Sequence, residues 1–157
     1  MRTRRCGGDY GAISGGDGDR NGDKLRQNQP MSDDIDIGVA YTVQDLANEL
    51  RVYRWAVESN RDVIPWPRFV WGLWSKTFVR SSGLERKSAP MPTDLVEQVT
   101  GLDPFRAVVV IVGRARAAVS GRAADLEIAS VEHHALRFLE TPEGKIRQKY
   151  LDEHPTP

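Results

Sequence analysis

The side chains best suited to chemistry in this 157-residue chain are two adjacent histidines, His133 and His134. Consecutive residues of a helix point about 100° apart, so these two imidazoles do not face one metal ion. Neither Glu132 nor His154 completes the spacing of a ligand set, and the single Cys6 lies in a segment with almost nothing apolar to bury. No Gly-Lys-Ser/Thr motif marks a phosphate-binding loop. We therefore expect no metal site, no cofactor and no enzymatic activity.

The charged residues balance over the whole chain but not along it. Lys plus Arg and Asp plus Glu number 22 each, so the formal net charge is zero. Residues 51–87 nevertheless carry eight basic against three acidic side chains, and residues 106–122 carry four arginines without an acid. A basic middle region can attract phosphate, as nucleic-acid binding requires, or can be an ordinary solvated surface.

Residues 43–62, VQDLANELRVYRWAVESNRD, fit the spacing of a helix-turn-helix. This motif needs a small residue where its two helices cross, and apolar residues that fill the angle between them. Arg51 stands where the turn usually has Gly, and Asn60 stands where the second helix usually has Val or Ile. The stretch is also typical of one continuous amphipathic helix, because nothing between Leu50 and Tyr53 forces a turn. The positions that suit the helix-turn-helix are Leu46, Ala47, Leu50, Val52 and Val57.

Residues 41–80 resemble the small excisionase and MerR-like helix-turn-helix DNA-binding proteins. YTVQDLANELRV is similar to the opening of that family, and VIPWPRFVWGLW can be aligned with the basic aromatic β-wing that follows its second helix. The resemblance implies that residues 53–61 form a recognition helix for the major groove of DNA, and that the wing contacts phosphates. The residues it assigns are Tyr53, Arg54, Glu58 and Arg61 in the groove, and Arg68, Lys76 and Arg80 at phosphates.

Three of the four tryptophans fall within nine positions of the segment 63–79. Such a cluster is typical of an interface with a protein partner, because Trp and Arg dominate interface energies, or of the main core of a small fold. Pro65 and Pro67 are expected to exclude a helix at the start of the segment and to leave a short hairpin or wing. The residues considered for an interface are Trp66, Trp71, Trp74 and Phe78.

Along its length the chain predicts a mainly α protein. Residues 1–38 are rich in Gly and Asp and are expected to form a disordered tail, with residues 1–30 an upstream extension before Met31. Helical signals begin at Thr42, a suitable N-cap. The expected parts are a helix-turn-helix domain with its short β-wing at 39–80, a polar linker at 81–92 and a helical C-terminal region at 93–157.

The C-terminal region carries clear helix boundaries. Asp103 and Pro104 are typical of a helix start, and Gly121 is typical of a helix end. The β-branched run between them also suits a strand, but its boundaries favour a helix, which we expect. Thr141 and Pro142 open the last helix, which is expected to run to about residue 153. Similar signals predict helices at 93–100 and 123–140.

The sequence therefore predicts a non-enzymatic DNA-binding protein of helix-turn-helix type, a phage or bacterial regulator that acts as an oligomer. The alternative is a structural subunit that assembles with itself or with a larger protein complex through the tryptophan segment and the C-terminal helices. A single cysteine forms no disulfide within the chain, which suits a reducing cytoplasm. The longest apolar run, AVVVIV at 107–112, is far short of a membrane span, so no membrane partner is expected.

Overall fold

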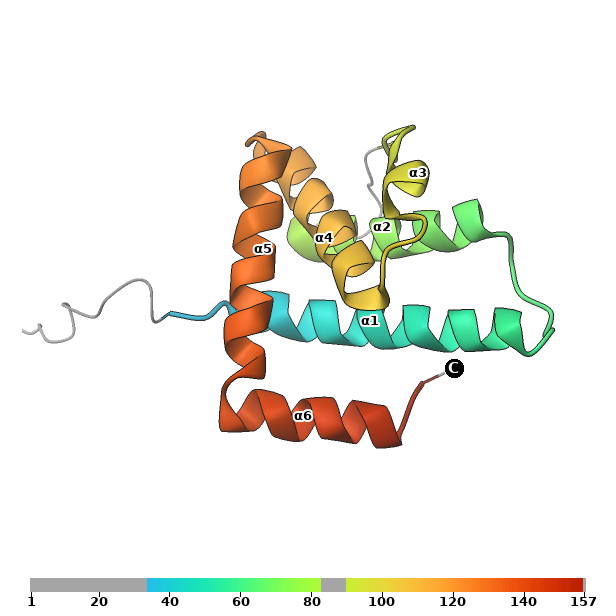
Figure 1. The fold of residues 1–157 in the computed structure, drawn as a ribbon. Helices are drawn as coiled ribbons and strands as arrows, with labels where there is room; N and C mark the ends of the chain where they lie inside the picture. The colour runs from blue at the N-terminus through green and yellow to red at the C-terminus, as the bar shows by residue number, and fades with distance from the viewer. Residues whose placement is uncertain (1–33, 83–89, 157) are drawn as a thin grey trace, which may run out of the picture. The chain divides into compact units, whose positions relative to one another are not determined.

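A computed structural model describes residues 34–82 and 90–156, and within these ranges the chain forms α-helices and no strand (Figure 1). The prediction of a mainly α protein is confirmed, and the prediction of a short β-wing is wrong. The predicted tail and linker fall largely at 1–33 and 83–89, outside the described residues. The helices are α1 (Ile37–Glu58), α2 (Trp66–Ser82), α3 (Leu95–Val99), α4 (Pro104–Ser120), α5 (Ala124–Leu139) and α6 (Pro142–Glu153).

The helix α1 is continuous over 22 residues, where the helix-turn-helix hypothesis expected two helices. It begins at Ile37, before the expected start at Thr42, because the carboxylate of Asp36 caps it by accepting the N–H of Val39 at 3.1 Å. No Gly or Pro interrupts its central turns, so the backbone continues through Arg51 without a break. The predicted turn at Arg51 is therefore wrong, and the alternative of one continuous helix is confirmed.

The helix α2 occupies the segment where two prolines were expected to exclude a helix. Pro65 precedes the helix and Pro67 lies in its first turn, where a backbone N–H has no acceptor within the helix. The carbonyl of Pro65 accepts the N–H groups of Arg68 and Phe69, each at 3.0 Å. The expectation of a hairpin was wrong because prolines at these two positions begin a helix and do not prevent one.

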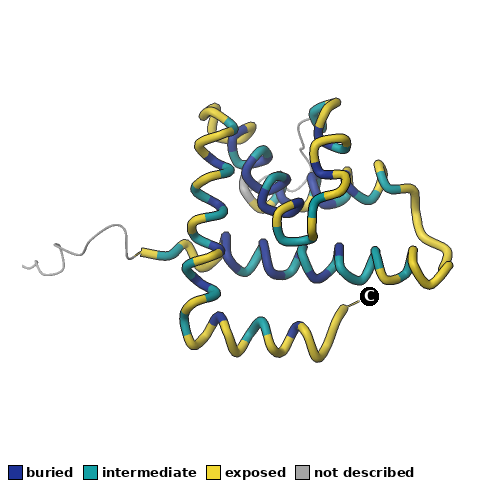
Figure 2. The backbone as a smooth tube through the Cα atoms, viewed as in Figure 1, coloured by how far each residue is buried: buried dark blue, intermediate teal, exposed yellow. Residues whose placement is uncertain are grey.

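The central element of the fold is α4, which packs against α1, α2, α3 and α5. The predicted helix is confirmed with its predicted boundaries: Asp103 accepts the N–H of Arg106 at 3.1 Å, and Gly121 ends the helix with a φ of 73°. Its β-branched side chains are buried on most faces, so packing outweighs their preference for strands. Figure 2 shows this burial along α4. The buried residues are Ala107, Val108, Val109, Ile111, Val112, Gly113, Ala115 and Ala117.

The close approach of α4 and α5 depends on Gly113. A Cβ atom placed there would lie 2.5 Å from the Cα and 2.6 Å from the Cγ1 of Ile128, so no larger residue fits without movement. Gly in a helix interior costs about 1 kcal/mol relative to Ala. The packing that Gly113 allows offsets this cost.

The helix α5 packs across α1 and then turns into α6, which returns alongside α1 (Figure 1). At the turn, the hydroxyl of Thr141 accepts the N–H of Gly144 at 2.9 Å and donates to the carbonyl of Phe138 at 2.7 Å. A Cβ on Gly144 would lie 1.8 Å from that carbonyl oxygen. The predicted start of the last helix at Thr141 and Pro142 is confirmed.

One hydrophobic core joins the segments on both sides of residues 83–89. Leu46 and Leu50 of α1 and Leu73 of α2 belong to the same buried cluster as the apolar residues of α4. The described residues from Ile35 onward form one compact unit. The last turns of α1 and the loop to α2 extend beyond this core and are mostly exposed (Figure 2).

Candidate functional site

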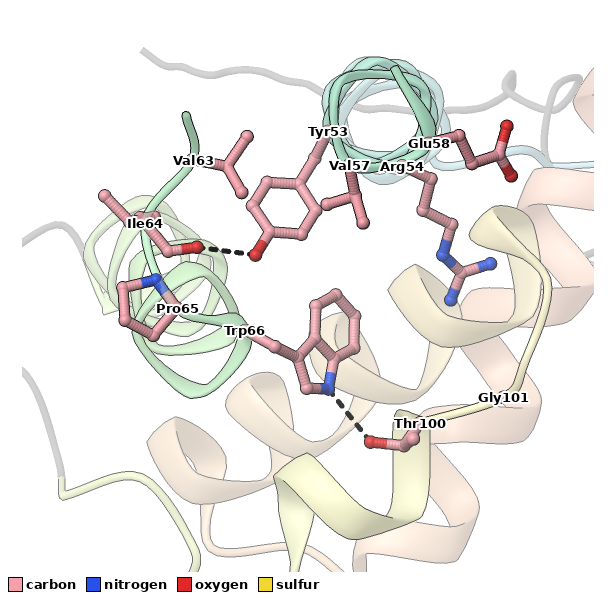
Figure 3. A pocket seen from close by; sticks show the side chains of 10 residues that line it. All are labelled: Tyr53, Arg54, Val57, Glu58, Val63, Ile64, Pro65, Trp66, Thr100 and Gly101. Carbon is pink, nitrogen blue, oxygen red and sulfur yellow. Dashed lines mark hydrogen bonds between the residues drawn. The ribbon is translucent and has the colours of Figure 1, made fainter. Parts of the chain in front are cut away.

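An apolar groove lies where α1 ends and α2 begins, a region that we call the α1–α2 corner (residues 53–69). The groove has a volume of about 610 Å³. Figure 3 shows its walls, which come from the last turns of α1, from the loop and first residue of α2, and from the turn after α3. Residues distant in sequence therefore meet around one hollow. The lining residues are Tyr53, Arg54, Val57, Glu58, Val63, Ile64, Pro65, Trp66, Thr100 and Gly101.

The corner begins at a Schellman motif that ends α1. Asn60 has a φ of 59°, in the left-handed region, and its N–H donates to the carbonyl of Val57 at 3.1 Å. The N–H of Arg61 donates to the carbonyl of Ala56 at 2.8 Å, which completes the motif. Asn enters this region more readily than other residues with a Cβ. Asn60 did not fit the helix-turn-helix pattern because it ends a helix.

Aromatic side chains hold the loop in place. Tyr53 stacks on Phe69 with ring centroids 4.1 Å apart, and its hydroxyl donates to the carbonyl of Ile64 at 2.6 Å. The ring of Trp66 lies 5.9 Å from that of Tyr53, and its indole N–H donates to the hydroxyl of Thr100 at 2.9 Å (Figure 3). Burial raises the pKa of the Tyr53 hydroxyl, which further favours the protonated form that donates this hydrogen bond. The two hydrogen bonds tie the loop to α1 and to the turn after α3.

Large apolar side chains stay exposed around this fixed loop. Trp55 is 52% exposed, and Val57 and Ile64 are about half exposed. Trp55 borders a second hollow that shares Tyr53 and Val63 with the groove. Val57 and Ile64 line the groove, whereas Trp55 lies outside it, at the second hollow and at a third one that it shares with Asp152.

Arginines accompany these aromatic rings. The guanidinium of Arg61 lies 4.7 Å from the ring centroid of Trp55, and that of Arg54 lies 5.8 Å from that of Trp66. Both distances suit a cation–π contact. Within the described ranges, no carboxylate lies at ion-pair distance from Arg54, Arg61 or Arg68. The charges of these arginines are available to a partner.

Five of the seven residues predicted to bind DNA belong to the α1–α2 corner: Tyr53, Arg54 and Glu58 line the groove, whereas Arg61 and Arg68 are exposed and do not line it. The other two lie further along α2. Lys76 pairs with Glu49 at 2.8 Å, and Arg80 lines a different cavity near Arg116.

The predicted interface residues separate into different environments. Trp66 lines the groove, and Trp71 on α2 is 50% exposed. Trp74 is 1% exposed in the core, and the partly buried Phe78 packs against that core. Sequence reasoning did not assign Val63 and Ile64 to a site. The sequence feature that could have identified Val63 and Ile64 is their place as two apolar residues in a short loop, between an Asn that ends one helix and a Pro that begins the next.

His133 and His134 have ring centroids 5.6 Å apart, and the Nδ1 of His134 accepts the backbone N–H of Asp36 at 3.2 Å. In residues 34–82 and 90–156, no group of three or more His, Cys, Asp and Glu side chains is placed to hold a metal ion. Cys6 lies outside these ranges. None of the helices found there is long and apolar enough to cross a lipid bilayer.

Comparison with protein-family models, with curated proteins and with solved structures finds no match for this chain. Its function therefore has to be inferred from the residues and geometry of the α1–α2 corner.

Proposed function

We propose that this protein is a non-enzymatic assembly subunit that pairs with a second copy of itself through the α1–α2 corner. The observation that carries this proposal is the group of half-exposed apolar side chains around a groove with fixed walls. Single exposed apolar residues are ordinary, whereas a contiguous group rimmed by polar residues marks an interaction surface. Trp, Tyr and Arg are also the residue types that contribute most to protein interfaces.

The charges at the corner favour a second copy as the occupant. Arg54 and Arg61 lie beside Glu58 and Asp62, so the surface carries both signs. A twofold interface places one patch against the same patch, and a patch with both signs can pair with itself. A strongly acidic or strongly basic partner would meet repulsion from half of these groups.

The first test compares two tryptophans of similar exposure, Trp55 at the corner and Trp71 outside it. We expect Trp55→Ala to weaken self-association about tenfold or more, because pairing would bury this ring, and we expect Trp71→Ala to leave self-association unchanged. The measurement is sedimentation equilibrium of the full chain over a range of concentrations, with circular dichroism as the check on folding. A wild-type protein that stays monomeric, or an effect of Trp71→Ala alone, would overturn the proposal.

A charge-exchange experiment tests the twofold arrangement directly. Arg54→Glu and Glu58→Arg each give a corner in which like charges meet in the homodimer. Mixed in equal amounts, the two variants bring opposite charges together, so a heterodimer should form more strongly than either homodimer. Mass spectrometry under native conditions distinguishes the three species. A statistical mixture would exclude the pairing of Arg54 with Glu58 across the interface.

DNA binding is the second candidate function, and the three arginines without described carboxylate partners favour it. Arg54, Arg61 and Arg68 could neutralise phosphates, while exposed Trp55 offers a ring on which a base can stack. Binding through phosphates weakens steeply from low to moderate salt, whereas apolar pairing persists. We expect any such affinity for DNA to fall in Arg54→Ala by about 1–3 kcal/mol. An affinity that is unchanged in this variant would exclude the assignment of Arg54 to DNA.

A further inference from the structure

A second cavity lies between α1 and the helices α4, α5 and α6, and it shares no lining residue with the groove at the α1–α2 corner. Its volume is about 390 Å³, which is within the range of pockets that hold small molecules. Phe105, Leu136 and Leu139 give it apolar walls, and Gln44 and Asn48 of α1 contribute amides.

Gln44 is the unusual residue of this cavity. It is 5% exposed, and both Oε1 and Nε2 are buried without a hydrogen-bond partner among the described residues. Asn48, one turn further along α1, is equally buried, but its Oδ1 accepts a hydrogen bond from Arg51 at 2.6 Å. Nearly all buried polar groups in native proteins have a partner, because an unpaired one opposes folding. The amide of Gln44 therefore needs one hydrogen-bond donor and one acceptor, and the described residues supply neither.

We propose that this cavity binds a small planar molecule with an apolar body and a lactam edge. A lactam presents an N–H and a carbonyl side by side, which is the complement of the Oε1 and Nε2 of Gln44. Phe105, Leu136 and Leu139 would surround the apolar body. The site is independent of the pairing proposed for the α1–α2 corner.

Both amide atoms of Gln44 are shielded from solvent, so a ligand reaches them only if a neighbouring helix moves, and α6 lines the cavity through Gln148. This helix buries only Gly144 and Leu151. Polar contacts also attach it to α1, including the pair of Arg51 with Asp152 at 2.6 Å. Segments with few buried apolar contacts open more readily than the core. α6 is therefore suited to admit a ligand without unfolding the bundle.

The test uses two probes, the bicyclic lactam carbostyril and its N-methyl derivative, which lacks the N–H donor. The full chain is titrated with each probe by heteronuclear NMR, in the wild type and in Gln44→Leu. We expect the wild type to bind carbostyril about tenfold or more tightly than the N-methyl compound. Only carbostyril can form hydrogen bonds with both the Oε1 and the Nε2 of Gln44. In Gln44→Leu this discrimination should disappear, while Gln148→Leu, at the same cavity, should retain it.

Three results would overturn the proposal: no saturable binding up to the solubility of the probe, equal affinity of the two probes in the wild type, or discrimination that survives in Gln44→Leu. In each case an ordered water, and not a ligand, would supply the missing hydrogen bonds of the Gln44 amide. Gln44→Leu should also melt no lower than the wild type, because it removes an unpaired polar group. The two-probe comparison in the wild type decides the question even if that variant does not fold.

Discussion

The α4–α5 contact and the α1–α2 corner are both rich in apolar side chains, but only the α4–α5 contact buries most of them. At the contact, Gly113 lets two helices approach until no Cβ fits between them. At the corner, hydrogen bonds from Tyr53 and Trp66 fix the loop while Trp55 stays half exposed. Dense packing stabilises the fold. A rigid apolar surface that no described residue covers can still gain free energy when a partner buries it. Under the proposed function, stability and recognition therefore depend on different regions.

The largest expected effect is the difference between a core and a corner tryptophan. Trp74→Ala should lower the free energy of unfolding by about 3–5 kcal/mol, because it leaves a large cavity in the core. Trp55→Ala should change it by less than about 1 kcal/mol, because half of that side chain is already in water. Urea unfolding at a concentration where the protein is monomeric measures both. Equal losses would mean that the corner belongs to the core and is no binding surface.

The second-largest effect on stability is expected from two glycines that both lie inside helices, one at the α4–α5 contact and one in α2. Gly113→Ala should destabilise the protein by roughly 1–3 kcal/mol, since the new methyl group meets the backbone of Ile128. Gly72→Ala in α2 meets nothing within 4 Å, so it should stabilise the protein by up to about 1 kcal/mol through helix propensity. Chemical denaturation of the two variants is the measurement. Similar shifts would show that α4 and α5 can separate at little cost.

The helices of the C-terminal region could be predicted from the sequence because their boundaries are local. Asp103 with Pro104, and Thr141 with Pro142, begin helices through hydrogen bonds within three residues. The prediction at Pro65 and Pro67 was wrong, because these prolines stand just before α2 and in its first turn, where they do not exclude a helix. A proline therefore marks the end of a helix or the start of one, and its position alone does not say which.

The α1–α2 corner could be predicted only in part. The helix-turn-helix resemblance singled out Tyr53 and Arg54, the tryptophan cluster singled out Trp66, and all three line the groove. The groove itself depends on Thr100, which meets Trp66 across 34 positions of sequence. The unpaired amide of Gln44 likewise results from how four helices pack. No local pattern encodes either arrangement.

A smaller effect is expected at the helix end that shapes the corner. Asn60→Ala should destabilise the protein by roughly 1 kcal/mol, because Ala is strained at a positive φ, whereas Asn60→Gly should cost little. Both variants are measured by thermal unfolding and by sedimentation. If the proposed pairing uses this loop, Asn60→Ala should also weaken association. Unaltered stability of Asn60→Ala would mean that aromatic stacking alone fixes the corner.

The smallest effect concerns a third kind of contact, the polar attachment of α6 to α1. The guanidinium of Arg51, 2.6 Å from the carboxylate of Asp152, holds the pKa of Asp152 below its usual range. A carboxylate whose pKa is lower in the folded than in the unfolded chain stabilises the fold above its unfolded pKa. That stabilisation is lost as the pH falls through the folded pKa. Because both groups are largely solvated, the pair should contribute only about 0.2–1 kcal/mol.

Asp152→Asn should therefore be less stable than the wild type at neutral pH, and the difference should shrink below about pH 4, where the carboxyl becomes protonated. Arg51→Met removes the same pair, so the double variant should show the pH profile of either single variant. Unfolding free energies across this range provide the measurement. A profile unchanged by Asp152→Asn would mean that other contacts hold α6 against α1, such as the burial of Leu151 and the pair of Arg147 with Asp45.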